Sequence, residues 1–160
     1  MTRQRQQNAF TLVEVLVALV LMTAVLLPLL GILSNSLLMT QDNRRLTKAI
    51  YLGNEIKEWS GFLLKRPTQG TGSYKTIWDL QEETFSPPVA APDMSNPTSP
   101  TPLTDYDGWS QSVSLSRREE GNPILADSTG TSTLVRMQCI VKYEGEEIYR
   151  LLWLVKETSS

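Results

Sequence analysis

Apolar positions are distributed very unevenly along the chain, and their spacing predicts its elements. Residues 10–33 hold 19 apolar side chains in 24 positions, and no charged residue occurs from Val15 to Gln41, a run of 27 positions. A helix crosses the hydrocarbon core of a membrane with about 20 residues. Residues 10–33 are therefore predicted to form a membrane-spanning helix.

Residues 34–65 continue with apolar positions at helical spacing, which predicts an amphipathic helix that leaves the membrane. Pro67 and Gly70 are expected to end it. Its polar side is expected to carry Lys48, Asn54, Glu55 and Glu58. Its apolar side, which we expect to pack on a sheet, comprises Leu46, Ala49, Ile50, Leu52, Ile56, Trp59 and Leu63.

Residues 66–160 are predicted to form a β-rich head. Alternation of apolar and polar residues indicates strands at 74–80, 109–115, 135–143 and 149–155, and the last two read as an antiparallel hairpin. Residues 84–104 hold six of the nine prolines and read as a loop, either passive or used in recognition. The predicted fold class is α+β: a long N-terminal helix whose second half packs on a small antiparallel sheet.

The amino-acid composition excludes several kinds of catalytic and metal-binding site. The chain has 15 basic and 17 acidic residues, a net charge of −2, no histidine and one cysteine, Cys139. Catalysis by Ser-His-Asp or Cys-His sets, histidine-dependent metal sites and an intrachain disulfide are excluded. The acidic balance argues against a nucleic-acid partner. We expect no enzyme activity, although an acid-only site is not excluded by composition.

Two weaker sites rest on carboxylates. Asp105 and Asp107 flank Tyr106 before Gly108, and oxygen-rich loops can bind calcium. The later ligands of a complete calcium loop are missing, so a plain turn is the favoured interpretation and no cofactor is expected. The pairs Glu82-Glu83, Glu119-Glu120 and Glu146-Glu147 are adjacent in sequence and would point to opposite faces of a strand.

Glu14 does not suit an ordinary membrane anchor. It lies inside the apolar run, where a carboxylate at the bilayer centre costs ~3 kcal/mol. It is only four residues after Phe10, however, so in a lone subunit it could extend to the membrane interface, and a plain anchor stays open. Residues 1–9 precede the run with two arginines and no acid, and end in the small residue Ala9. Cleavage after Ala9 would place a cationic amino group on Phe10, one helical turn from Glu14. The apolar run is too long for a secretory signal peptide.

The segment from Ala9 to Leu19, AFTLVEVLVAL, resembles the prepilin signal of type IV pilins and pseudopilins, and is closest to the minor pilins of the V and I kinds. The resemblance implies cleavage by prepilin peptidase between Ala9 and Phe10, methylation of Phe10, and pairing of Glu14 with an amino terminus during filament assembly. The residue before the cut is usually glycine in that family. Ala9 departs from this pattern and is expected to be processed more slowly.

The resemblance also implies partners and a location. We expect a leader peptide (1–9), a membrane and filament-core helix (10–33), an amphipathic helix (34–65) and a head (66–160), assembled with other pilin or pseudopilin subunits by an inner-membrane platform. The head is placed in the periplasm on this ground, since cations on both sides of the span nearly balance. The filament would be a type IV pilus or a type II secretion pseudopilus. The alternative is an uncut single-pass inner-membrane protein with a periplasmic binding head.

Pro28 and Gly31 lie in the second half of the apolar run. Proline removes one backbone hydrogen bond from a helix, so we expect a break or kink there. Two interpretations remain open. The zone loosens during filament assembly, as the resemblance implies, or it is a simple kink tolerated in a membrane helix.

Overall fold

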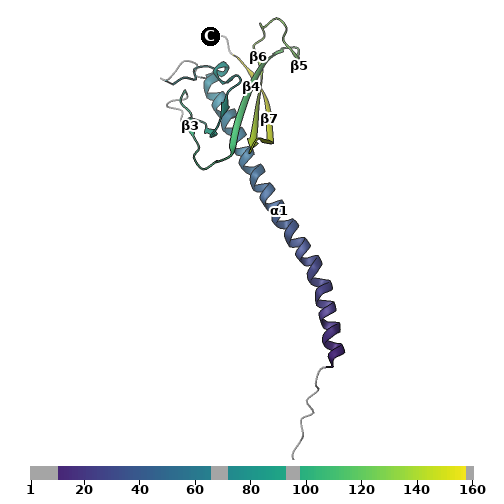
Figure 1. Cartoon of the computed structure of the whole chain (residues 1–160). Coiled ribbons are helices and arrows are strands. Elements are labelled where there is room, and N and C mark those ends of the chain that lie inside the picture. The colour runs from purple at the N-terminus through teal and green to yellow at the C-terminus, as the bar shows by residue number, and fades with distance from the viewer. Residues whose placement is uncertain (1–10, 66–71, 93–97, 158–160) are drawn as a thin grey trace, which may run out of the picture. The chain divides into compact units, whose positions relative to one another are not determined.

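The computed structural model describes residues 11–65, 72–92 and 98–157 (Figure 1). The chain divides into two units, Met1–Asn43 and Arg44–Ser160, and the helix α1 (Leu12–Lys65) begins in the first unit and ends in the second. The other described elements are the 3₁₀ helix η1 (Ile77–Leu80) and the strands β1 (Thr84–Phe85), β2 (Val89–Ala90), β3 (Thr101–Pro102), β4 (Trp109–Glu119), β5 (Asn122–Ala126), β6 (Leu134–Tyr143) and β7 (Glu146–Lys156).

The first unit exposes all of its apolar side chains. Every described residue from Thr11 to Asn43 is exposed, and α1 is the helix of the described residues that is long and apolar enough to cross a membrane. Two of its hydroxyls are bonded within the helix: those of Thr23 and Thr40 donate to backbone carbonyls three or four residues earlier, at 2.8–3.0 Å. A helix that has no charged residue from Val15 to Gln41 and that bonds these hydroxyls internally suits an apolar surrounding.

α1 continues through Pro28 and Gly31, so the helix does not break there, and the expected kink stays a prediction. Proline removes a single hydrogen bond and the helix on either side keeps its own, so one proline does not have to end a helix of 54 residues. A Cβ added at Gly31 would have no atom within 4 Å apart from the neighbouring backbone of its own helix.

The second unit packs the later part of α1 against a sheet. Apolar positions recur every three or four residues and form one buried stripe, Ala49, Leu52, Gly53, Ile56, Trp59, Ser60 and Leu63. The prediction was wrong for Leu46 and Ile50, which are 42% and 38% exposed. Leu46 lies one turn before the first buried residue, and Ile50 lies at the margin of the stripe.

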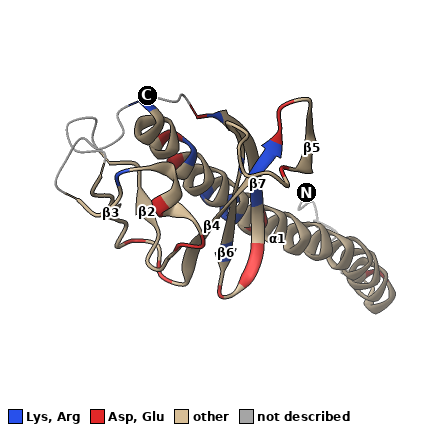
Figure 2. Ribbon diagram, turned by 90° about the horizontal axis from the view of Figure 1, so that it is seen from above, with Lys and Arg blue, Asp and Glu red and all other residues tan. Residues whose placement is uncertain are grey.

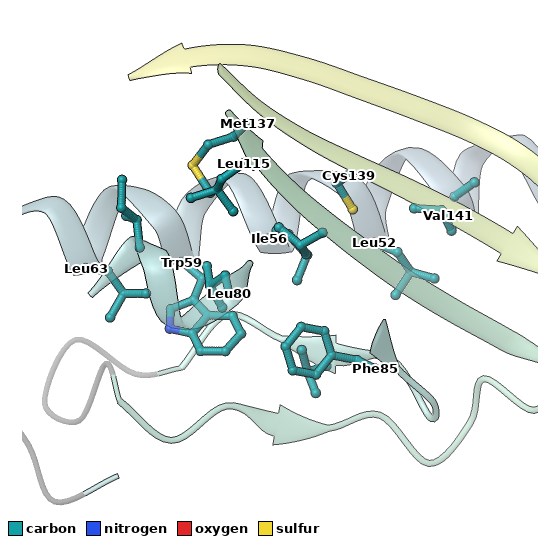
Figure 3. Packing of buried hydrophobic residues seen from close by; sticks show 14 of the residues in the cluster. Leu52, Ile56, Trp59, Leu63, Leu80, Phe85, Leu115, Met137, Cys139 and Val141 are labelled. Carbon is teal, nitrogen blue, oxygen red and sulfur yellow. The ribbon is translucent and has the colours of Figure 1, made fainter. Parts of the chain in front are cut away.

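The main sheet has the order β1-β4-β6-β7, with β5 pairing with β4, and all its pairings are antiparallel. The register aligns Val113 with Cys139 and Cys139 with Leu151. Every second residue of β4 and β6 therefore faces α1, as the alternation predicted. Figure 3 shows the helix side chains meeting Met137, Cys139 and Val141 in one core. The predicted hairpin of the last two strands is confirmed.

One prediction between the helix and β4 was wrong. Residues 74–80 do not form a strand: residues 77–80 form η1, because Asp79 Oδ2 accepts hydrogen bonds from the backbone N–H groups of Lys75 and Thr76, both at 2.7 Å. The proline-rich segment, predicted as a loop or partly ordered linker, contains three strands of two residues each among its described residues, β1, β2 and β3, and β2 pairs with β3. Gly70 and Pro67 lie outside the described residues.

A buried glutamine fastens the proline-rich segment to the core. Gln111 is fully buried, and its Nε2 donates to the carbonyls of Leu52 on α1 (2.8 Å) and Val89 on β2 (3.2 Å). Its Oε1 accepts from the N–H of Val89 at 2.7 Å. Glu55 of α1 accepts a further bond from the N–H of Ala91 at 2.6 Å. Side chains of α1 and β4 therefore bond to backbone groups of Val89 and Ala91 and hold this segment against the core.

Candidate functional site

The carboxylate predicted to matter, Glu14, closes the first turn of α1. The backbone N–H of Thr11 donates to Glu14 Oε2 at 3.0 Å, and the Thr11 hydroxyl contacts the same oxygen at 3.1 Å. The N–H of Glu14 donates to Thr11 Oγ1 at 3.3 Å. This reciprocal pair is a capping box, in which both ends of a Thr-x-x-Glu sequence satisfy free donors of a helix terminus.

The capping box fixes where the carboxylate lies relative to the chain's start. Glu14 Oε2 contacts the N–H of Thr11, and the backbone nitrogen of Phe10 is one residue further, roughly 3.5 Å of chain. Ala9 and Phe10 themselves lie outside the described residues.

Glu14 has no cationic partner among the described residues, where the ion pairs join Arg150 to Glu147 and Arg117 to Glu157. The nearest described cation along the sequence of α1 is Arg44, thirty residues later. The carboxylate is exposed in its own unit. An acid in an apolar segment is a candidate functional residue, and its partner stays a prediction.

Thr11 is the residue whose role the sequence analysis missed. It was part of the recognised segment but was given no task of its own. The signal was present, because Thr-x-x-Glu before an apolar run is a helix-start pattern. The prediction treated Glu14 only as an unpaired charge, whereas the structure also gives it a local function at the helix terminus.

The segment that carries these residues matches a known family profile. A profile described as a prokaryotic N-terminal methylation motif covers residues 4–30. The chain carries the methylation motif of type IV pilin-like proteins. No curated protein matches the chain, and no solved structure does. The motif is that of proteins processed by prepilin peptidase and assembled with other pilin-type subunits, a structural rather than an enzymatic class.

The pilin-like motif lies within the first unit. The head contains the other candidate site residues, which are carboxylates and one cysteine. Asp105 and Asp107 lie in the turn before β4. Within the residues that the structure describes, no group of three or more His, Cys, Asp or Glu side chains gathers to hold a metal ion. Cys139 is fully buried, and this burial raises the pKa of its thiol to about 12. A thiol held protonated in the core is chemically inert.

In two of the three acidic pairs, one carboxylate has a local partner. Glu147 forms a two-point contact with Arg150, at 2.8 and 3.0 Å, which lowers the pKa of Glu147. Glu120 accepts a bond from the Thr133 hydroxyl at 2.6 Å, and this bond lowers the pKa of Glu120. Both carboxylates are therefore used locally, by partners other than the neighbouring acid.

Proposed function

We propose that the chain is a minor pilin or pseudopilin, cut between Ala9 and Phe10, methylated on Phe10 and assembled through α1 into a type IV pilus or a type II secretion pseudopilus. The methylation motif over residues 4–30 carries this proposal. The exposed apolar side chains of the first unit support it, because they need either lipid or neighbouring helices as a solvent.

The proposed cycle has two states of the same helix. Before assembly, α1 is held in the inner membrane with the head in the periplasm. During assembly, the apolar face moves from lipid to the α1 helices of neighbouring subunits, so that protein contacts replace lipid contacts. The assembly platform of the inner membrane would drive this transfer.

Glu14 would act as a check on processing. A carboxylate inside a helix bundle needs a cation, and the amine of a cut chain supplies one. An uncut chain has a neutral peptide at Phe10 and leaves the carboxylate unpaired. The pair would therefore select processed subunits and set their axial register, and Thr11 would hold the carboxylate in position.

The intact mass of the membrane-extracted chain, made with and without prepilin peptidase, tests this proposal. We expect loss of residues 1–9 and gain of one methyl group only when the peptidase is present. An Ala9→Gly variant is the matched control and should be processed at least as fast. A chain that stays uncut in both forms would favour the alternative, an uncut single-pass protein with a periplasmic binding head.

A further inference from the structure

Three cations follow the uncharged run of α1 closely and have no carboxylate partner in the part of the chain that the structure describes. Arg44, Arg45 and Lys48 begin the second unit and are exposed. The ion pairs of the described residues use Arg117 and Arg150 instead. The N–H donors of the three side chains are therefore not taken up by an acid of the same chain.

Two of these cations lie on tyrosine rings of the head. The guanidinium carbon of Arg45 is 4.9 Å from the centroid of the Tyr143 ring. Lys48 Nζ is 5.4 Å from the centroid of the Tyr106 ring, on which Tyr51 also stacks at 6.4 Å. A ring face attracts a cation without neutralising it, so both side chains are held in place and keep their full charge.

The place of the cations along α1 indicates which acceptor is near them. The uncharged run from Val15 to Gln41 has 27 residues, about 40 Å of helix, and Figure 2 shows this stretch of α1 in tan. A bilayer with its headgroup regions is about 40–45 Å thick. A helix that spans a bilayer with this run brings Arg44, three residues later, to the level of the lipid phosphates. Tyrosine, lysine and arginine are also the side chains that anchor proteins at this level.

Acidic residues adjoin the cations and narrow the choice of lipid group. Asp42 precedes the cations on α1, Asp105 and Asp107 flank one of the two tyrosines in sequence, and Glu144 follows the other. Four acids beside three cations leave no excess of positive charge, so attraction to a net-negative surface does not explain the arrangement. The phosphate group, which zwitterionic and anionic phospholipids share, is the acceptor that unpaired guanidinium and ammonium donors fit.

We propose that these residues form a seat for the head on the membrane, and we call Arg44, Arg45, Lys48, Tyr106 and Tyr143 the headgroup seat. The cations of the seat donate to phosphate oxygens of phospholipids on the side where α1 leaves the bilayer, and the two rings hold them in position. The seat keeps the head on the membrane surface before assembly. This inference rests on the proposed function only in that α1 spans a membrane, and it does not depend on N-terminal cleavage.

Fluorescence quenching by a nitroxide on the lipid headgroup tests the contact. The full-length chain is placed in phosphatidylcholine nanodiscs that contain a minor share of headgroup-nitroxide lipid, and a thiol-reactive fluorophore is attached at Thr104→Cys. Thr104 is exposed and lines a cavity with Tyr106 of the seat. Buried Cys139 takes no label. We expect strong quenching of this probe in zwitterionic lipid alone.

Ser128→Cys provides the matched probe site. Ser128 is exposed and lines a cavity with Glu119, whereas Thr104 lines one with Trp109. Trp109 and Glu119 are the two ends of β4, roughly 30 Å apart along the strand. The Ser128 probe should therefore show little quenching. Equal quenching of the two probes, or none at Thr104, would overturn the proposal.

Substitution of the cations separates binding from mere nearness to the membrane. Arg45→Gln and Lys48→Gln should each lower the ratio of quenched to unquenched Thr104 probe about fivefold, because each removes a charged donor to phosphate. Lys57→Gln, an exposed site later on α1, is the matched control and should leave the ratio unchanged. An unchanged ratio in the first two variants, in chains whose Cys139 stays unreactive and which are therefore folded, would contradict the proposal.

The rings of the seat and the N-terminus are checked in the same way. Tyr106→Phe keeps the ring face under Lys48 and should retain the quenching, whereas Tyr106→Leu should lower it. The chain is made with prepilin peptidase, and its mass is measured before it enters the nanodiscs. A cut chain whose Thr104 probe is not quenched contradicts this inference alone, whereas an uncut chain whose probe is quenched contradicts only the proposed function.

Discussion

At the scale of single residues, Gln111 is a buried polar side chain that joins β4 to α1 and β2. It is fully buried and bonds at once to α1 and to both backbone groups of Val89. Gln111→Leu has a similar volume but leaves the donor and acceptor of Val89 unpaired in the core. We expect the free energy of unfolding to fall by about 1–3 kcal/mol, measured by urea titration of tryptophan fluorescence on the detergent-solubilised chain.

Gln138 provides the matched control for this prediction. It carries the same side chain on β6, but half-buried on the outer face of the sheet. Gln138→Leu should change the free energy of unfolding by no more than about 0.5 kcal/mol. Equal losses in the two variants would mean that the bonds of Gln111 contribute nothing beyond the fit of its side chain.

At the scale of elements, the start of α1 separates two tasks of Glu14. Glu14→Gln keeps a hydrogen-bond acceptor for Thr11 but removes the charge, so α1 should form and insert while incorporation into filaments is lost. Thr11→Val removes the hydroxyl that contacts the carboxylate and should lower incorporation partly, whereas Thr11→Ser should not. The measurement is the ratio of subunit in sheared filaments to subunit in membranes. Normal incorporation of Glu14→Gln would show that the charge has no role.

The same scale shows why some elements were predictable and others were not. The stripe from Ala49 to Leu63 and the strands β4, β6 and β7 repeat a period over ten or more residues, and the sequence predicts them. The strands β1, β2 and β3 have two residues each, which is too few to show a period, and η1 depends on the hydrogen bonds of Asp79. The motif around Glu14 could be read from the sequence. The hydrogen bonds between Thr11 and Glu14 could not, because they form only when the helix begins at Leu12.

At the scale of the whole molecule, the ionisable groups predict a broad plateau of stability. The chain has no histidine, so no ordinary side chain changes charge between about pH 5 and 8. Asp127 has a pKa of about 2, below its ordinary value near 4, so its contribution is present above about pH 4 and is lost as the pH falls toward 2. The fall in stability at low pH should therefore lie below about pH 4.

The loss of stability at high pH comes from groups whose pKa is raised, not lowered, in the folded chain. A hydrogen bond to Glu55 raises the pKa of Tyr51 to about 12, and burial does the same for Cys139. Both contributions are complete below the ordinary values of about 10 and 8.5, and are lost as the pH rises toward 12. The midpoint of thermal unfolding should therefore stay level from about pH 5 to 8 and fall on both sides. Tyr51→Phe should reduce the alkaline fall and leave the acid fall unchanged, whereas a steep change near pH 6.5 would contradict this assignment of the titrating groups.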